Sequence, residues 1–257
     1  MSKKQVQLDS DAIERAERNP NDYDLSTQML EMIQESPIPE NEKLRNLFLF
    51  MDRRMISRLL FMNELYQKMM HLHGSIFEFG VRYGVNEAIW TSLRGIYEPF
   101  NHNRKIVGFD SFEGFLEISE HDKADKQVGG FGVVEGYEDY LAKLLSLHEK
   151  MAPVEAIQKF QLVKGDAIVE LQAYLENHQE TIVSFAYFDF DLYEPTLQCL
   201  QILEPYLAKG AVIGFDELNV EQWPGETKAL RDWLGDRKMS IRHSPFRGAA
   251  AYLIYGE

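Results

Sequence analysis

Two long apolar runs stand out in the hydrophobic pattern of the chain, and each of them ends in acidic residues. The runs cover residues 182–189 and 210–215, and the acids at their ends are Asp189, Asp191, Asp216 and Glu217. Runs of this kind are typical of strands that are buried on both faces of a parallel sheet. Because open α/β sheets bind ligands beyond the carboxyl ends of their strands, these acids are predicted to face one crevice. Carboxylates so close together either hold a cation or raise each other's pKa values and share protons.

Three earlier segments have the same form, a strand that leads into a glycine or an acid. They lie at residues 75–79, 104–110 and 160–166. Helical periodicity predicts helices over 86–94, 136–150, 168–176, 195–207 and 227–234, and two strands follow at about 239–243 and 250–255. This alternation predicts an α/β fold with a seven-stranded, mostly parallel Rossmann-like sheet and helices on both of its faces.

The N-terminal region and one later stretch lie outside this alternation. Residues 1–40 are polar and interrupted by prolines, and the region from there to residue 73 has apolar residues, several of them methionines, at helical spacing. We expect an N-terminal helical arm over 1–73 that packs on the core or on a second copy, and one domain over 74–257. Residues 115–150 begin with an irregular stretch rich in acids, lysines and glycines, and are expected to form a lid over the ligand site.

The charge balance argues against a nucleic acid as partner. The chain has 41 acidic and 27 basic residues and a formal net charge of −14, whereas nucleic-acid-binding proteins usually have a basic surface. No apolar run is long enough for a membrane span and the N-terminus lacks the pattern of a signal peptide, so no membrane partner and a cytoplasmic location are expected. Cys199, the only cysteine, lies in an apolar helical pattern and is expected to be buried rather than nucleophilic.

The glycine turn after the first strand lets backbone amides approach a ligand at the start of the next helix. It is a poor dinucleotide fingerprint, because three residues separate Gly80 from Gly84 and the third glycine is missing. Asp110, some 26 residues further on, lies where nucleotide-binding folds place the carboxylate that binds ribose hydroxyls. Capping of a turn or helix is the alternative explanation for Asp110, Asp191 and the pair at 216–217. Their position at the ends of neighbouring strands favours a nucleoside-binding site.

Five blocks of the sequence resemble the macrocin O-methyltransferase family. They lie, in the family's order, at residues 78–84, 108–114, 164–166, 188–196 and 215–217, and the Asp-x-Asp-Leu-Tyr-Glu block at 189–194 is the most specific. Members of this family are class I S-adenosylmethionine (SAM)-dependent sugar O-methyltransferases of antibiotic biosynthesis. The segment from Phe215 to Glu226 is further similar to a branch that acts on the sugars of enediyne-type natural products.

The resemblance implies SAM as cofactor and gives each matching position a role. Glu78 and the glycine turn would hold the methionine part, Asp110 the ribose, Ser111 and Phe112 the adenine ring, and Asp166 the adenine amino group. The cofactor-binding residues implied in this way are Glu78, Gly80, Gly84, Asp110, Ser111, Phe112, Gly165, Asp166 and Asp189.

The resemblance also implies a metal site and a catalytic base. Asp189, Asp216 and Glu217 would bind a divalent cation, usually Mg²⁺, and Asp191 would be the general base. The family commonly has two aspartates where this chain has Asp216 and Glu217. A cation-bound hydroxyl ionises more readily and a nearby carboxylate can take its proton, and oxygen ligands favour Mg²⁺ over zinc.

The expected function is therefore magnesium-assisted O-methylation of a sugar hydroxyl on a small-molecule glycoside, by a homodimer or larger homo-oligomer assembled through the N-terminal helices. Two alternatives stay open at this point. One is an O-methyltransferase for a catechol or another diol, which the same metal chemistry would serve. The other is a methyltransferase-like module that binds and assembles without catalysis.

Overall fold

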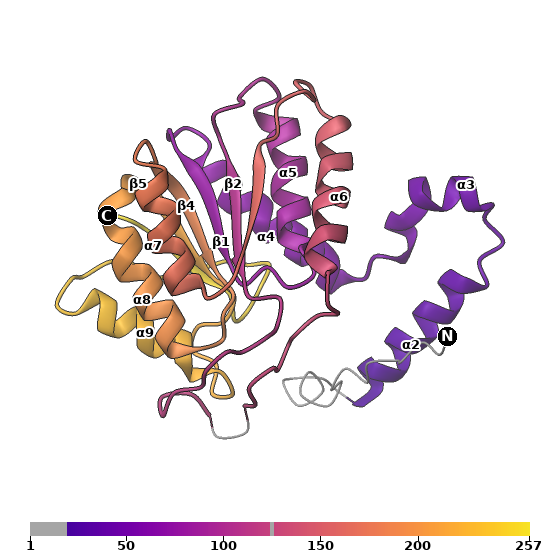
Figure 1. Ribbon diagram of the computed structural model, residues 1–257. Coiled ribbons are helices and arrows are strands. Elements are labelled where there is room, and N and C mark those ends of the chain that lie inside the picture. Colours follow the sequence, from indigo (N-terminus) through magenta and orange to yellow (C-terminus); the bar gives the residue numbers. More distant parts are fainter. Residues whose placement is uncertain (1–19, 124–125) are drawn as a thin grey trace. The chain divides into compact units, whose positions relative to one another are not determined.

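The computed structural model describes residues 20–123 and 126–257 (Figure 1). The chain divides into two compact units, Met1–Arg58 and Leu59–Glu257. The expected boundary at residue 73 stays a prediction. Helix α4 (Arg53–Met69) crosses the division after Arg58, and its second half packs into the core of the second unit, where Phe61, Leu65 and Met69 are fully buried.

The first unit is built from short helices. They are α2 (Pro20–Gln34), α3 (Glu40–Lys43), the 3-10 helix η1 (Leu44–Phe50) and the first turns of α4. Asp52 caps α4, because its carboxylate accepts hydrogen bonds from the backbone amides of Arg54 at 2.8 Å and Met55 at 2.9 Å. The helices α3 and η1 contain no buried residue. The arm therefore has little core of its own, as expected, while residues 1–19 of the expected arm lie outside the described residues.

The second unit contains one seven-stranded sheet with the strand order β3-β2-β1-β4-β5-β7-β6. Its strands are β1 (Ser75–Phe79), β2 (Ile106–Asp110), β3 (Phe160–Lys164), β4 (Val183–Phe188), β5 (Leu207–Phe215), β6 (Arg242–His243) and β7 (Ala251–Ile254). Strands β1 to β5 pair in parallel, and β7 runs antiparallel to β5 and β6. The predicted α/β fold with a seven-stranded, mostly parallel sheet is confirmed.

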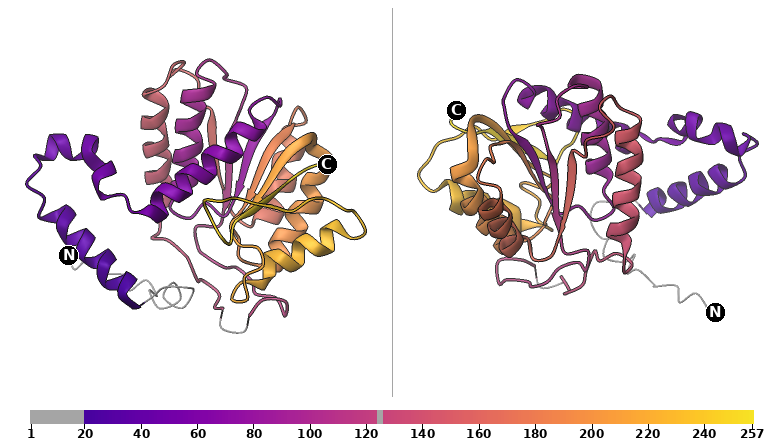
Figure 2. Two further views of the ribbon diagram at one scale, coloured as in Figure 1. Left: turned by 180° about the vertical axis from the view of Figure 1, so that it is seen from behind. Right: turned by 45° about the horizontal axis from the view of Figure 1, so that its top comes forward.

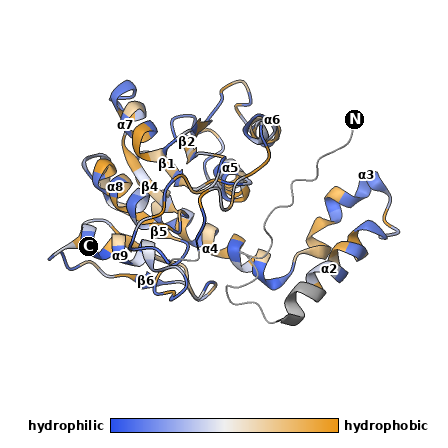
Figure 3. Cartoon of the chain, turned by 60° about the horizontal axis from the view of Figure 1, so that its bottom comes forward, coloured by the Kyte–Doolittle hydropathy of each residue, from blue (hydrophilic) through white to orange (hydrophobic). Residues whose placement is uncertain are grey.

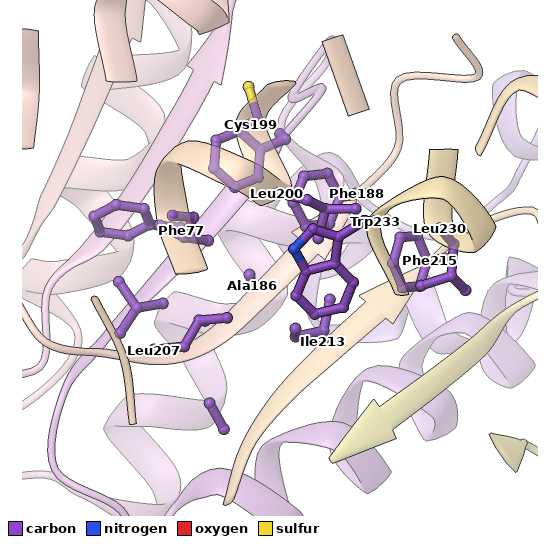
Figure 4. Packing of buried hydrophobic residues seen from close by; sticks show 14 of the residues in the cluster. Phe77, Ala186, Phe188, Cys199, Leu200, Leu207, Ile213, Phe215, Leu230 and Trp233 are labelled. Carbon is purple, nitrogen blue, oxygen red and sulfur yellow. The ribbon is translucent and has the colours of Figure 1, made fainter. Parts of the chain in front are cut away.

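Helices cover both faces of the sheet (Figure 2). One face carries α7 (Ala167–Asn177), α8 (Tyr193–Leu203) and α9 (Pro224–Leu234), and the other carries α4, α5 (Val85–Tyr97) and α6 (Tyr137–Lys150). Figure 4 shows the first face, where Trp233, Leu200 and Leu230 pack over Phe188 and Phe215. Cys199 is buried in this cluster and burial raises the pKa of its thiol, as expected for a structural cysteine.

Helix α6 belongs to this core. Its residues Leu141 and Leu145 are fully buried, and α6 packs beside α5 and β3. The lid expected over 115–150 stays a prediction, and residues 124–125 of that range lie outside the described residues.

Candidate active site

The parallel strands end at one level, directly above a row of aromatic rings. Phe79, Phe109, Phe188 and Phe215 come from four neighbouring strands, and adjacent rings stack at 4.7–5.4 Å. The backbone continues the pairing one residue beyond the rings, where the amides of Asp189 and Asp216 donate to the carbonyls of Phe79 and Phe188. The acids that follow the strands are thus brought to one edge of the sheet, as the sequence predicts.

The strand order changes direction next to β1, because β2 and β3 follow β1 on one side of it and β4 lies on the other side. Open α/β sheets bind their ligands at such a switch point. Gly80 has a φ of 91°, and a Cβ there would overlap the carbonyl of Asp189. Only glycine allows this approach of the turn to the end of β4.

Asp110 fixes the glycine turn in place. One of its carboxylate oxygens accepts hydrogen bonds from the backbone amides of Val81 and Arg82, both at 2.7 Å, and the other accepts from Phe112 at 2.6 Å. A carboxylate has about four acceptor positions, so the second oxygen retains capacity for a ribose hydroxyl. Asp110 therefore shapes the turn and keeps acceptor capacity for a ligand.

The remaining residues predicted for the cofactor are arranged around this turn. Gly165 follows β3, and its amide donates to the carbonyl of Asp110 at 3.0 Å. Asp166 is exposed and caps α7 by accepting from the amide of Ile168 at 2.9 Å. The hydroxyl of Ser111 donates to the carbonyl of Gly114, and Phe112 is buried in the core with a φ of 57°.

Glu78 lies below the turn and is paired with a second acid that the sequence analysis missed. Glu87 of α5 is fully buried and lies beside the side chain of Glu78. Burial raises the pKa of Glu87 from 4.5 to about 8, although the charge of Arg94 and the neighbouring Glu78 lower it. At neutral pH Glu87 is therefore mostly protonated and supplies the proton that lets two carboxyl groups share one buried position.

Asp191 lies in the most acidic part of the site. Burial, followed by the charges of Glu217 and Asp216, raises the pKa of Asp191 from 3.8 to about 8, and the charges of Lys126 and Arg82 lower it. Its backbone has a φ of 62°, a left-handed conformation that is uncommon outside glycine and concentrates at functional sites. With a pKa of about 8 the carboxyl group of Asp191 is mostly protonated at neutral pH, so the ionised form that can accept a proton grows as pH rises or as a cation approaches the acids.

Asp216 already has two partners. The phenol of Tyr187 donates to one of its oxygens at 2.6 Å, and the guanidinium of Arg247 lies 3.1 Å from the other. Neither Tyr187 nor Arg247 was predicted as part of the site. Arg247 lies in the irregular connection before β7, where no local sequence pattern points to a partner at the end of β5.

A further acid, Glu226, lies beneath the predicted ones. It is fully buried in the first turn of α9, and its carboxylate accepts from the amides of Phe190 at 3.0 Å, Asp191 at 3.2 Å and Glu217 at 3.4 Å. Burial, followed by the charges of Asp191, Asp189 and Asp216, raises the pKa of Glu226.

Two cations and several aromatic rings lie beside the acids. The guanidinium of Arg82 lies over the rings of Tyr83 and Phe131 at 4.9 and 4.8 Å, and the ammonium of Lys126 lies over the ring of Trp223. The rings of Phe131 and Trp223 are 5.7 Å apart, so the irregular segment 111–136 meets the start of α9 here. Asp122 of the same segment accepts from the amide of Tyr193 at 2.9 Å, directly beyond the Asp191 loop.

The donor chemistry of the acids fits a hard divalent cation, since all of the predicted ligands are carboxylates. Among residues 20–123 and 126–257, however, no three His, Cys, Asp or Glu side chains are grouped closely enough to hold a metal ion. A cation at Asp189, Asp216 and Glu217 would therefore need these side chains to move together, and Asp216 to give up part of its contact with Arg247.

The strand order 3-2-1-4-5-7-6, with an antiparallel seventh strand and a glycine turn at the switch point, defines a class I methyltransferase. Comparisons with solved structures show which methyltransferases the chain is similar to. The chain is 39% identical to the calicheamicin methyltransferase CalS11 with a TM-score of 0.91, over 94% of this chain and 95% of that one. An apo structure of CalS11, described as a TDP-rhamnose 3'-O-methyltransferase, matches with 37% identity and a TM-score of 0.84, over 94% and 97%.

The chain belongs to the macrocin O-methyltransferase family of SAM-dependent sugar O-methyltransferases, and it is an O-methyltransferase. The O-methyltransferase NovP shares the fold, with 15% identity, a TM-score of 0.59 and coverage of 79% and 81%. No family model matches the chain, and no curated protein matches it. The non-catalytic alternative from the sequence analysis is thereby set aside.

Proposed function

We propose that the protein transfers the methyl group of SAM to a hydroxyl of a sugar carried by a glycosylated small molecule, and that a nucleotide-linked deoxysugar is the first acceptor class to test. The observation that carries the proposal is geometric: the loops after β4 and β5 bring Asp191 and Glu217 together at the switch point of a class I methyltransferase sheet, where the backbone amides of both donate to the buried Glu226. The related CalS11 is described as acting on TDP-rhamnose.

The reaction follows from the residues at the strand ends. Asp191 takes the proton of the sugar hydroxyl, the hydroxyl oxygen forms a bond to the methyl carbon, and the bond from that carbon to the sulfonium sulfur breaks, which leaves S-adenosylhomocysteine and the methyl ether. The turn held by Asp110 positions the cofactor. Positioning of two reactants can supply about 7–11 kcal/mol of the barrier, so the rigid edge of the sheet matters as much as the base.

A Mg²⁺ ion is part of the proposal. Asp189, Asp216 and Glu217 would hold it, and when bound it would lower the pKa of the sugar hydroxyl. Support comes from the negative charges at this site, because those of Glu217 and Asp216 raise the pKa of Asp191, those of Asp191, Asp189 and Asp216 raise that of Glu226, and a bound cation would relieve the repulsion.

The cations beside the acids support a negatively charged acceptor. A diphosphate would be repelled by the carboxylates, whereas Arg82 and Lys126 lie close enough to Asp191 to lower its pKa. Phe131 and Trp223 would supply the flat apolar contacts that sugar and base rings use. A neutral catechol uses neither cation, so no observation favours that alternative.

The proposal includes a homo-oligomer formed through the arm. Figure 3 shows hydrophobic and hydrophilic residues side by side on α2 and on the helices that follow it. Large apolar side chains that are exposed in this region are Leu25, Met29, Leu30, Met32, Leu44, Leu47, Phe48 and Leu49. An apolar patch of this kind marks an interaction site, and the same patch on a second copy offers a partner of matching chemistry.

The proposal also covers the cellular location of the protein. No helix within the part of the chain that the structure describes is long and apolar enough to cross a membrane. We keep the cytoplasmic location expected from the sequence as a proposal, because the enzyme needs the cellular supply of SAM.

The test combines SAM calorimetry with methyl transfer from labelled SAM to a panel of TDP-linked deoxysugars, glycosides and catechols. We expect SAM to bind and label to pass to the sugars only, with a large loss of transfer after treatment with EDTA and recovery on addition of Mg²⁺. Label on catechols alone would refute the sugar proposal. Transfer that is unchanged by EDTA would refute the metal proposal while leaving the acceptor assignment intact.

A further inference from the structure

Glu226 joins the two loops that carry the acids. One of its oxygens accepts from the backbone amides of Phe190 and Asp191, in the loop after β4, and the other from the amide of Glu217, in the loop after β5. The residue is itself on a third element, the first turn of α9. A single buried carboxylate thus connects three segments that surround the strand ends.

The hydrogen bonds of the Glu226 side chain go to segments other than its own helix. Pro224 opens α9, and Trp223 at its N-cap position makes no side-chain capping bond. The side chain of Glu226 points to the neighbouring loops and accepts hydrogen bonds from their partly buried backbone amides, which would lose this acceptor if the side chain were replaced. Its position among Asp189, Asp191 and Asp216 is electrostatically unfavourable, so an apolar residue of similar size would relieve repulsion but leave these amides unsatisfied.

The consequence for Asp191 is geometric. Asp191 has a left-handed backbone, which costs on the order of 1–3 kcal/mol unless its surroundings fix it. The hydrogen bond from its own amide to Glu226 acts directly on that backbone. The preceding residue of α9, Gly225, lies so near that a Cβ there would be 2.8 Å from the carbonyl oxygen of Asp191.

We propose that Glu226 is a positioning residue for the methyl transfer: it holds Asp191 and the loop of Glu217 in one arrangement through backbone hydrogen bonds and contacts no substrate. This inference rests on the proposed role of Asp191 as base. Both oxygens are needed. In Glu226→Gln one acceptor becomes an NH2 donor that faces an amide donor, and in Glu226→Asp the carboxyl group is kept but the shorter side chain no longer reaches both loops.

The test measures kcat, the acceptor KM, the SAM dissociation constant and the melting temperature for both variants. We expect kcat to fall by about tenfold to 100-fold, as for small misplacements of catalytic groups, with unchanged SAM affinity. Glu149→Gln is the matched control, because Glu149 is also buried and is paired with Arg94. It contacts Lys159, just before β3 begins, and so lies at the opposite end of the strands from the acids. It should lower the melting temperature and leave kcat unchanged.

A double-mutant cycle separates positioning from general destabilisation. If Glu226 acts through Asp191, adding Glu226→Gln to Asp191→Asn should cause little further loss of kcat. Wild-type kcat in both Glu226 variants, or losses that multiply fully in the double variant, would overturn the proposal. Failure of the proposed function is seen separately, as unchanged turnover in Asp191→Asn alone. If Glu226→Gln does not fold, Glu226→Asp enters the same cycle.

Discussion

Glu78 and Glu87 form a buried pair of carboxyl groups that makes stability depend on pH. Glu87 has a pKa of about 8 in the folded protein, against 4.5 as its ordinary value. Between these values the folded state holds a proton that the unfolded state releases, so the free energy of unfolding decreases as pH rises. The stabilisation is present below about pH 4.5 and is lost as pH passes through about 8.

We therefore predict that Glu87→Gln makes the fall of the melting temperature between pH 5 and pH 8 shallower, since the amide cannot ionise. Thermal unfolding at several pH values measures this. Glu176→Gln, an exposed acid on α7, is the control and should keep the wild-type slope. A Glu87→Gln protein with the wild-type slope would show that Glu87 is already ionised in the native state.

Which single residues could be predicted from the sequence depends on where their partners lie. Four acids come directly after apolar runs that read as strands, so the sequence places them at the carboxyl ends of the sheet: Asp189, Asp191, Asp216 and Glu217. Glu226 could not be found in this way, because an acid in the first turn of a helix is ordinary and its partners are up to 36 residues away. Arg247 and Glu87 were missed for the same reason, since the fold alone brings each to its acid.

Helix α9 is the element that sets the shape of the acidic edge. Its start packs directly on the Asp191 loop, where a Cβ at Gly225 would lie 2.5 Å from an oxygen of Asp122, 2.7 Å from the amide of Tyr193 and 2.8 Å from the carbonyl of Asp191. Two of these neighbours are backbone atoms, which cannot move aside as a flexible side chain can.

Gly225→Ala should therefore push α9 away from the Asp191 loop. We predict a loss of kcat of about tenfold or more together with a lower melting temperature. Gly235→Ala, at the other end of the same helix, meets no atom within 4 Å and serves as the control for kcat, although its φ of 53° adds backbone strain. Wild-type kcat in Gly225→Ala would mean that the contact is not needed for the active geometry.

Most strands and helices of the second unit could be predicted, because the hydrophobic periodicity and the turn residues indicate the same elements along the sequence. The exception was the stretch 115–150, where acids, lysines and glycines suggested one insertion. Its second part, α6, has Leu141 and Leu145 at helical spacing and completes the core instead. The lid expected over 115–150 stays a prediction.

For the whole molecule, the large apolar side chains exposed on the first unit are the basis for proposing assembly with a second copy. We predict that Phe48→Glu shifts the protein toward the monomer in sedimentation velocity, since Phe48 is 71% exposed and a charge there cannot be buried against a second copy. Phe100→Glu, at a residue 75% exposed in the second unit, is the matched control. Equal behaviour of both variants and the wild type would contradict assembly through the arm.

The account depends most on Asp191 as the base of a sugar methylation. The direct measurement is the rate of methyl transfer from saturating SAM to TDP-rhamnose by the wild type and by Asp191→Asn, with SAM affinity determined in parallel. We predict unchanged SAM affinity and a loss of rate of about 100-fold or more, because general base catalysis typically contributes 10²–10⁴-fold. Transfer at the wild-type rate by Asp191→Asn would contradict the account.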